Sequence, residues 1–306
     1  MARIGLSING WLIIDKPRGL SSAAIVGIAK RTTGAAKVGH GGTLDPLATG
    51  VLPLAFGEAT KTVAYVMDAR KQYGFTVRWG QARDTDDSAG QIVTESEVRP
   101  TRDAILAALP RFTGRIRQVP PDYSAIKVGG RRAYKLARAD KSPKLAAREV
   151  EVYRLELIGQ PDADHADFSV DCGKGTYIRS LARDLAQDLG TAGHIVHLRR
   201  HQAGPFNEKQ AISLEELGSL GHSAAHSKHL FSVETVLDDI PALALTEMEA
   251  ERLRCGQSVE VLRTEDQALL GRLEPGAVVR ACWGDRTVAI IRVEGNQIRS
   301  VRGFNL

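Results

Sequence analysis

The sequence feature that most restricts the fold is a glycine-rich stretch at residues 39–50, GHGGTLDPLATG, which contains a single carboxylate, Asp45. Its four glycines permit backbone torsions and close approaches that larger side chains would prevent. Pro46 biases the preceding Asp45 toward extended torsions, so the acid is held on a stiff turn. These residues alone leave two interpretations open: the carboxylate bonds its own backbone in an Asx turn, or it performs a chemical function.

Strand and helix patterns alternate along the rest of the chain. Apolar or alternating segments predict strands, and apolar residues three and four positions apart predict helices. The expected strands cover residues 11–14, 73–79, 150–157 and 167–172, and the expected helices begin at Ser21 or Ser22, at Thr101 and shortly after Gly175. Pro120 and Pro121 lack amide donors, so residues 118–124 must form a rigid extended loop. This mixture predicts an α+β sheet protein.

The chain is expected to contain two domains of unequal size. Residues 218–229 are small and polar, and we expect them to act as a linker. Short alternating strands separated by glycines follow from about Asp239, which is typical of a small β-rich domain. The predicted domains are residues 1–238 and residues 239–306.

The positive charge of the chain is concentrated in one region. The formal net charge is +5, but residues 241–306 carry nine basic and nine acidic side chains. Residues 111–154 carry twelve basic and four acidic side chains, with four aromatic residues among them. Basic residues interleaved with aromatics suit a phosphate backbone with exposed bases, although a solvated positive surface explains the charge equally well.

Several classes of protein are not expected. No apolar run approaches the length of a membrane span, and the N-terminal segment has only a short apolar burst, so neither secretion nor membrane insertion is predicted. The three cysteines, Cys172, Cys255 and Cys282, form no Cys-x-x-Cys pair. They indicate neither a disulfide framework nor a thiolate metal site, and they favour a reducing cytoplasm.

Metals and nucleotide cofactors are not expected either. Histidines cluster at residues 194–201 and 222–229, but no nearby carboxylate completes a known ligand pattern, which favours a structural or solvated role. The stretch GHGG at residues 39–42 lacks the G-x-G-x-x-G spacing of dinucleotide-binding loops. The stretch GKG at residues 173–175 lacks the Ser or Thr of a phosphate-binding loop.

Five motifs make the chain similar to the TruB-type tRNA pseudouridine synthases from Trp11 to about Phe206. They are LIIDKPRG at residues 12–19, the 39–50 loop with GEATK at 57–61, KQY at 71–73, QVPPDYSAIK at 118–127 with Gly130 and Tyr134, and KGTYIR at 174–179 leading to LRR at 198–200. The resemblance implies the pseudouridine synthase fold, with a mixed, largely antiparallel sheet flanked by helices and a small PUA-like module. It also implies an isomerase that converts uridine 55 in the T loop of tRNA into pseudouridine without a cofactor.

The same resemblance implies the catalytic residues. Asp45 matches the family's catalytic carboxylate, which attacks either the sugar C1′ or the base C6, and the sequence leaves both open. Arg179 would pair with Asp45 and favour its ionised form. Tyr73 would stack on the uracil and help to remove the C5 proton. His40 would occupy the place of the flipped-out nucleotide and so reduce the cost of unstacking.

The resemblance also implies RNA contacts. Lys16, Lys61, Tyr123 and Leu198 match further family positions, where packing, phosphate contact and chemistry all stay open. The partner is expected to be the T-arm of tRNA, recognised through its backbone, its shape and the splayed loop. The chain is expected to act as a monomer. The basic candidates for backbone contact are Lys127, Arg131, Arg132 and Lys174.

The sequence departs from the family pattern in two places. Arg83 stands where the family commonly has Thr, and the segment after Asp239 matches loosely and has no net charge, which argues against strong RNA contact there. Two other functions stay open: an RNA-binding or tRNA-folding protein of this fold that no longer reacts, and a pseudouridine synthase for another RNA. The combination of Asp45, Tyr73 and Arg179 argues against the first, and the 39–50 loop argues against the second.

Overall fold

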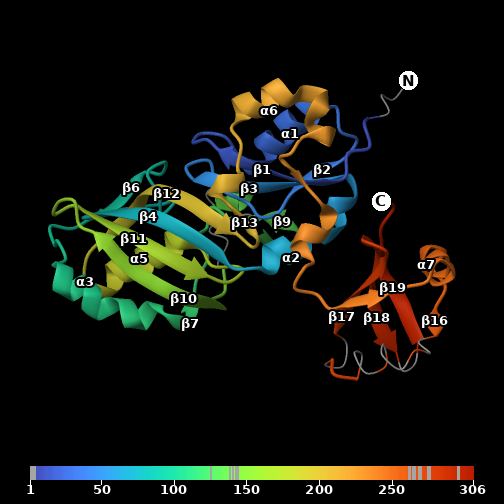
Figure 1. Cartoon of the computed structure of the whole chain (residues 1–306). Helices are drawn as coiled ribbons and strands as arrows, with labels where there is room; N and C mark the ends of the chain where they lie inside the picture. Colours follow the sequence, from blue (N-terminus) through green and yellow to red (C-terminus); the bar gives the residue numbers. More distant parts are fainter. Residues whose placement is uncertain are drawn as a thin grey trace.

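The computed structural model describes residues 5–124, 126–137, 139, 141, 145–260, 263, 267, 271–273, 277–294 and 297–306. A ten-stranded sheet flanked by helices forms the larger part, and a five-stranded sheet lies beside it (Figure 1). The α+β class and the mixed sheet that the sequence predicts are confirmed.

The ten-stranded sheet has the order β14-β1-β3-β12-β4-β11-β10-β7, with β13 paired to β12 and β2 paired to β3. Its pairs are antiparallel except for β3 with β12, which run parallel. Its strands are β1 (Gly10–Lys16), β2 (Val38–His40), β3 (Thr49–Phe56), β4 (Lys71–Trp79), β7 (Gly114–Gln118), β10 (Arg148–Gly159), β11 (His165–Cys172), β12 (Gly193–Ala203), β13 (Phe206–Asn207) and β14 (Leu230–Phe231).

Helices cover this sheet and connect its strands. The α-helices are α1 (Ser22–Thr33), α2 (Val63–Asp68), α3 (Arg102–Ala108), α4 (Ala133–Ala137), α5 (Ile178–Asp188), α6 (Leu214–Leu220) and α7 (Glu247–Arg254). Short 3-10 helices are η1 (Gly57–Thr62), η2 (Leu109–Phe112), η3 (Glu208–Gln210), η4 (Gly221–His226) and η5 (Val233–Val236). Within the described part of the chain, no helix has the length and apolar character needed to cross a membrane.

Local sequence explains the elements that support the site. β4 alternates buried and half-buried residues along its whole length, as its period-two pattern predicts. α1 begins where the Ser21 side chain accepts a hydrogen bond from the Ala24 amide, and it ends at Gly34, whose φ is +68°. Two small hairpins lie outside the main sheet: β5 (Gln81–Arg83) with β6 (Ile92–Glu95), and β8 (Lys127–Val128) with β9 (Arg131–Arg132).

The expected linker at residues 218–229 is wrong. This segment contains the end of α6 and the helix η4, and β14 follows it and pairs with β1. Leu217 and Ala224 are buried in the main core, and Leu220 packs against the same cluster. Leu217 and Leu220 lie three positions apart in α6, and Ala224 lies in the separate helix η4, so two short helices pack on the core where small and polar residues conceal the apolar pattern.

The second sheet has the order β15-β17-β18-β19-β16. Its strands are β15 (Ala242–Ala244), β16 (Val259–Glu260), β17 (Val278–Trp283), β18 (Arg286–Glu294) and β19 (Gln297–Gly303). This sheet and α7 enclose a hydrophobic cluster of their own. A small β-rich arrangement was expected here from the glycine-separated alternating strands.

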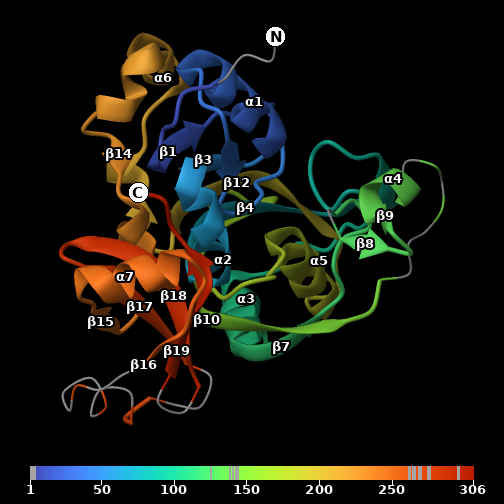
Figure 2. The same ribbon diagram turned by 90° about the vertical axis from the view of Figure 1, so that its right-hand side faces the viewer.

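The end of the chain packs against the first sheet (Figure 2). Phe304 is 2 % exposed and belongs to one hydrophobic cluster with Trp11 of β1 and Phe206 of β13. The Asn305 amide donates to the Glu58 carboxylate at 2.7 Å. The C-terminal residues therefore complete a core that begins at β1.

We predict that Phe304→Ala lowers the free energy of unfolding by about 3–5 kcal/mol, because it removes a buried ring and leaves a cavity between the two sheets. Urea denaturation of the full chain measures this loss. Val301→Ala is the matched control, since Val301 lies three residues earlier and is 48 % exposed. Equal, small losses in the two variants would contradict the packing role of Phe304.

Candidate active site

The Asp45 loop connects β2 to β3 and is fixed by α1. The Ser22 hydroxyl donates to the Leu44 carbonyl at 2.9 Å and accepts from the Leu44 amide at 2.8 Å. The Gly19 amide donates to the Pro46 carbonyl at 2.7 Å. Among the hydrogen bonds of the described residues, none joins the Asp45 carboxylate to its own backbone. The Asx-turn interpretation is therefore wrong, and the carboxylate is available for another partner.

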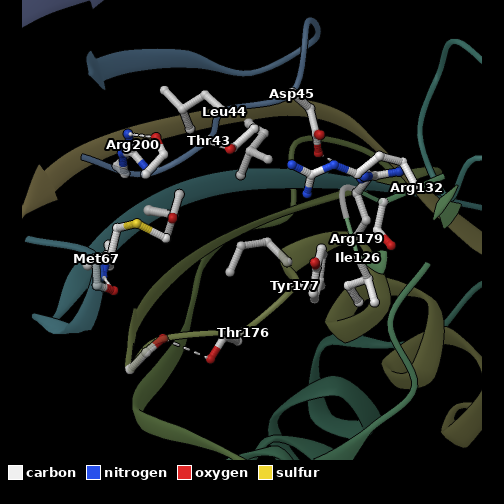
Figure 3. A pocket seen from close by; sticks show the side chains of 18 residues that line it. Thr43, Leu44, Asp45, Met67, Ile126, Arg132, Thr176, Tyr177, Arg179 and Arg200 are labelled. Carbon is white, nitrogen blue, oxygen red and sulfur yellow. Dashed lines mark hydrogen bonds and ion pairs between the residues drawn. The ribbon is translucent and has the colours of Figure 1, made fainter. Parts of the chain in front are cut away.

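That partner is Arg179, which lies in the first turn of α5. Its Nε is 2.9 Å from Asp45 Oδ2, and the side chain of Arg179 is 4 % exposed while that of Asp45 is 35 % exposed (Figure 3). Arg179 Nη1 donates to the Thr85 carbonyl at 2.8 Å, and Nη2 donates to the Tyr123 carbonyl at 3.0 Å. Asp87 Oδ2 lies 4.0 Å from Nε. The expected ion pair is present, and its guanidinium is oriented by contacts from three loops.

A cavity of about 390 Å³ opens beside this ion pair. Tyr73 of β4 and Leu198 of β12 line it from the sheet, and both side chains are largely buried. Burial raises the pKa of the Tyr73 phenol above its usual value. The lining residues are Gly42, Thr43, Leu44, Asp45, Met67, Lys71, Tyr73, Ser124, Ile126, Arg132, Gly173, Gly175, Thr176, Tyr177, Ile178, Arg179, Leu198 and Arg200.

Two predicted RNA-contact lysines have other partners in this structure. Lys16 is 0 % exposed, and its ammonium donates to the Pro17 carbonyl at 2.8 Å and the Pro46 carbonyl at 3.4 Å. Burial lowers the pKa of Lys16 to about 8, although the nearby Asp45 opposes this shift. Lys61 pairs with Glu58 at 2.7 Å and donates to the Gly303 carbonyl at 2.8 Å. Lys16 thus binds the loop that carries Asp45, and Lys61 binds the C-terminal segment through the Gly303 carbonyl.

Three other predicted residues, His40, Tyr123 and Lys174, are not among those that line the cavity. His40 is half-buried at the end of β2, and burial, reinforced by Arg200, lowers the pKa of its ring. The Tyr123 hydroxyl donates to Asp84 at 3.3 Å. Lys174 is exposed and pairs with Asp68 at 3.2 Å.

The basic hairpin β8–β9 stands away from the main sheet together with α4 (Figure 2). Lys127, Arg131 and Arg132 are exposed on it, and Arg132 also lines the cavity. Gly129 and Gly130 form its turn with φ values of +56° and +81°, which favour glycine. The hairpin therefore extends the cavity into a positively charged surface.

Arg83, which departs from the family pattern, closes the hairpin β5–β6. Its Nη1 donates to the Gly90 carbonyl at 2.7 Å. This hydrogen bond lies within the β5–β6 hairpin. Arg83, the departure from the family pattern, is not among the residues that line the cavity. Among the described residues, no group of three or more metal-binding side chains comes together.

Arg200 is a buried cavity residue that the sequence interpretation did not single out. Arg200 is 1 % exposed; its Nε donates to the Val51 carbonyl at 2.7 Å and its Nη2 donates to the Gly42 carbonyl at 3.1 Å. These two acceptors lie on either side of Asp45 in the sequence, so one guanidinium joins both ends of the loop. The LRR motif marked this position but did not show which of its two arginines turns inward.

Solved structures share this fold. A chain of the archaeal box H/ACA sRNP Nop10-Cbf5 complex is 23 % identical, with a TM-score of 0.73, and the match covers 98 % of this chain and 87 % of that one. A chain of an H/ACA RNP bound to a substrate RNA containing 2′-deoxyuridine is 22 % identical, with a TM-score of 0.72 and coverages of 97 % and 85 %. These likenesses show that the chain has the fold of these solved proteins.

Sequence comparisons are more specific. Residues 30–178 match the N-terminal domain of the TruB family pseudouridylate synthases, and residues 179–239 match the tRNA pseudouridylate synthase B C-terminal domain. The tRNA pseudouridine synthase B of Rhodospirillum rubrum is 52 % identical over 304 residues, covering 99 % of both chains. That of Caulobacter vibrioides is 48 % identical over 303 residues, covering 99 % of this chain and 98 % of its own. The chain belongs to the TruB family.

We predict that Gly50→Ala destabilises the loop more than its torsion alone requires. Gly50 has a φ of +96°, and an added Cβ would lie 2.2 Å from the Arg200 carbonyl oxygen. Gly19→Ala is the matched control, because Gly19 has a φ of +95° but a Cβ there would meet no atom within 4 Å.

We expect urea denaturation to show a loss of about 1–2 kcal/mol for Gly19→Ala, the cost of the left-handed torsion. Gly50→Ala should lose about 1–3 kcal/mol more, because β3 and β12 must move apart. If the two variants lost the same free energy of unfolding, the close approach would carry no energetic weight.

Proposed function

We propose that this chain isomerises uridine 55 in the T loop of tRNA to pseudouridine. Membership of the TruB family and full-length relatives that are named tRNA pseudouridine synthase B support an isomerase that acts on tRNA. The observation that carries the proposal is the Asp45 carboxylate, which is paired with buried Arg179 at a cavity of about 390 Å³. Such a cavity can take one flipped-out nucleotide.

In the proposed mechanism, Asp45 is the nucleophile. The Arg179 guanidinium pairs with one carboxylate oxygen, so the other oxygen can face the substrate. Attack on C1′ would break the bond between C1′ and N1, whereas attack on C6 would form an adduct with the base. In either route the uracil detaches, turns and forms a new bond from C5 to C1′. The C5 hydrogen is lost, and N1 gains a hydrogen.

In the proposed mechanism Tyr73 acts on the uracil. Its ring lines the cavity from β4 opposite the Asp45 loop, where it can stack on the uracil. Its hydroxyl is a candidate for removing the C5 proton. Leu198 lines the cavity from the neighbouring strand and packs against the bound base. His40 lies beside the loop and fills the gap that the flipped-out nucleotide leaves.

The RNA backbone is assigned to the exposed basic surface. Lys127 and Arg131 on the hairpin, Arg132 at the cavity and the exposed Lys174 would contact phosphates of the T-arm. The predicted division into residues 1–238 and 239–306 remains part of the proposal, with the second unit as an auxiliary RNA-binding module. We further propose that the chain works as a monomer in the cytoplasm.

We predict that Asp45→Asn abolishes catalysis and retains RNA binding, because the amide has the size of the carboxylate but is not nucleophilic. Release of tritium from C5-labelled uridine in a T-arm transcript should fall by at least about 10⁴-fold under single-turnover conditions. The Kd for the same transcript should change little.

Asp15→Asn is the matched control for this variant. Asp15 pairs with Arg199 at 3.0 Å outside the cavity, so its tritium release should equal that of the wild type. Normal release by Asp45→Asn would refute the catalytic assignment. A wild-type chain that binds the transcript but releases no tritium would instead support the RNA-binding alternative.

The double substitution Lys127→Gln with Arg131→Gln tests the hairpin. We predict weaker T-arm binding, and a plot of log K against log salt concentration that is less steep by about 1 for each lost phosphate contact. Arg102→Gln removes an exposed charge from α3 and should leave the salt dependence unchanged. A parallel salt dependence for the double variant and the wild type would remove the hairpin from the RNA interface.

A further inference from the structure

Arg200 is a buried cation that the proposed chemistry has not yet used. Its Nε and Nη2 donate to main-chain carbonyls, and no ion pair among the described residues includes it. The preceding residue differs: Arg199 pairs with Asp15 and Glu208 outside the cavity. Burying a charge without a counter-ion costs free energy of folding. The burial of the Arg200 guanidinium therefore indicates that it acts on a group in the cavity.

The sheet register places Arg200 beside Tyr73. The two residues are directly opposite each other in the antiparallel pair of β12 with β4, and both side chains line the cavity. Directly opposed residues point to the same face of a sheet and lie within contact distance. The Arg200 guanidinium therefore lies near the Tyr73 phenol, and its charge opposes the rise in the phenol's pKa that burial causes. In Figure 3, Arg200 and the Asp45–Arg179 pair lie on opposite sides of the cavity.

Three other ionisable groups lie near the phenol, and one of them, Lys71, is a second cation. Cys172 faces it from β11, and burial raises the pKa of that thiol to about 12, so it is neutral. Asp45 faces it from the loop and is already paired with Arg179. Lys71 lines the same cavity, but its ammonium is held by the carbonyls of Met67 and Ala69.

We propose that Arg200 is a positioning residue for the reaction, which holds the Tyr73 hydroxyl toward the base and stabilises negative charge on its oxygen. The inference rests on the proposed function. The product carries a hydrogen on N1 and none on C5. A phenol that gives its proton to the detached uracil and then takes the C5 proton is returned to its starting state. Between these two transfers its oxygen is anionic, and Arg200 compensates that charge.

The test measures the ionisation of Tyr73 directly. The six tyrosines of the full chain are replaced biosynthetically by 3,5-difluorotyrosine, which brings phenol titrations into an accessible pH range. The fluorine NMR signal of residue 73 is identified by its loss in Tyr73→Phe. We expect Arg200→Gln to raise the midpoint of that signal by about one pH unit or more, because a neighbouring cation favours the phenolate.

Two variants are matched controls. Arg200→Lys keeps the positive charge, and Arg199→Gln removes a cation from the same strand outside the cavity, so both should keep the wild-type midpoint within about 0.3 units. In unlabelled protein, tritium release should fall at least about tenfold in Arg200→Gln and recover substantially in Arg200→Lys. If the titration midpoint of residue 73 were the same in Arg200→Gln as in the wild type, the inference would be overturned.

Failure of this inference can be distinguished from failure of the proposed function. If wild-type protein released no tritium, the proposed function would fail, whereas the titration of Tyr73 would still show whether Arg200 acts on it. If Arg200→Gln does not fold, Arg200→Lys decides the question. A midpoint shifted upward by about one unit in that variant, despite the retained charge, would contradict the proposed role.

Discussion

The site depends on the neutralisation of one buried guanidinium. Arg179 is nearly inaccessible to solvent, and an isolated charge in that position would cost several kcal/mol. The Thr85 and Tyr123 carbonyls and the Asp45 carboxylate satisfy it from three separate segments of the chain. The three segments are far apart in the sequence, so they meet around the Arg179 guanidinium only when the sheet has folded. The reactive acid is therefore positioned by the same interactions that make the buried cation tolerable.

Much of this arrangement could be predicted from motifs. The α+β class, the strands β1, β4, β10 and β11 and the pairing of Asp45 with Arg179 follow from local patterns or from the family resemblance. The hydrogen-bond partners of a lysine side chain cannot be predicted from motifs. For Lys16 and Lys61 the sequence leaves packing, phosphate contact and chemistry open, and the fold brings main-chain carbonyls within hydrogen-bonding distance of both ammonium groups. Such acceptors exist at every residue, so no side-chain pattern marks them.

Arg200 and the 218–229 segment show two further limits of the sequence. Neighbouring arginines on a strand point to opposite faces, but the sequence does not say which face holds the cavity. The register of β12 against β4 decides this, and it is set by pairing over long sequence separations. In the 218–229 segment, a few apolar residues in two short helices pack against the main core although most of the composition is small or polar.

The burial of Phe304 against Trp11 has a consequence for how the protein is made. These two residues lie near opposite ends of the sequence, yet they share one hydrophobic cluster. During synthesis most of this cluster can form from earlier residues, but the place of the Phe304 ring stays open until that residue has emerged from the ribosome. Closing contacts of such long separation is slow because the loop entropy is lost before packing can compensate it. Nascent chains should thus expose the small apolar surface that Phe304 covers until that residue has been synthesised.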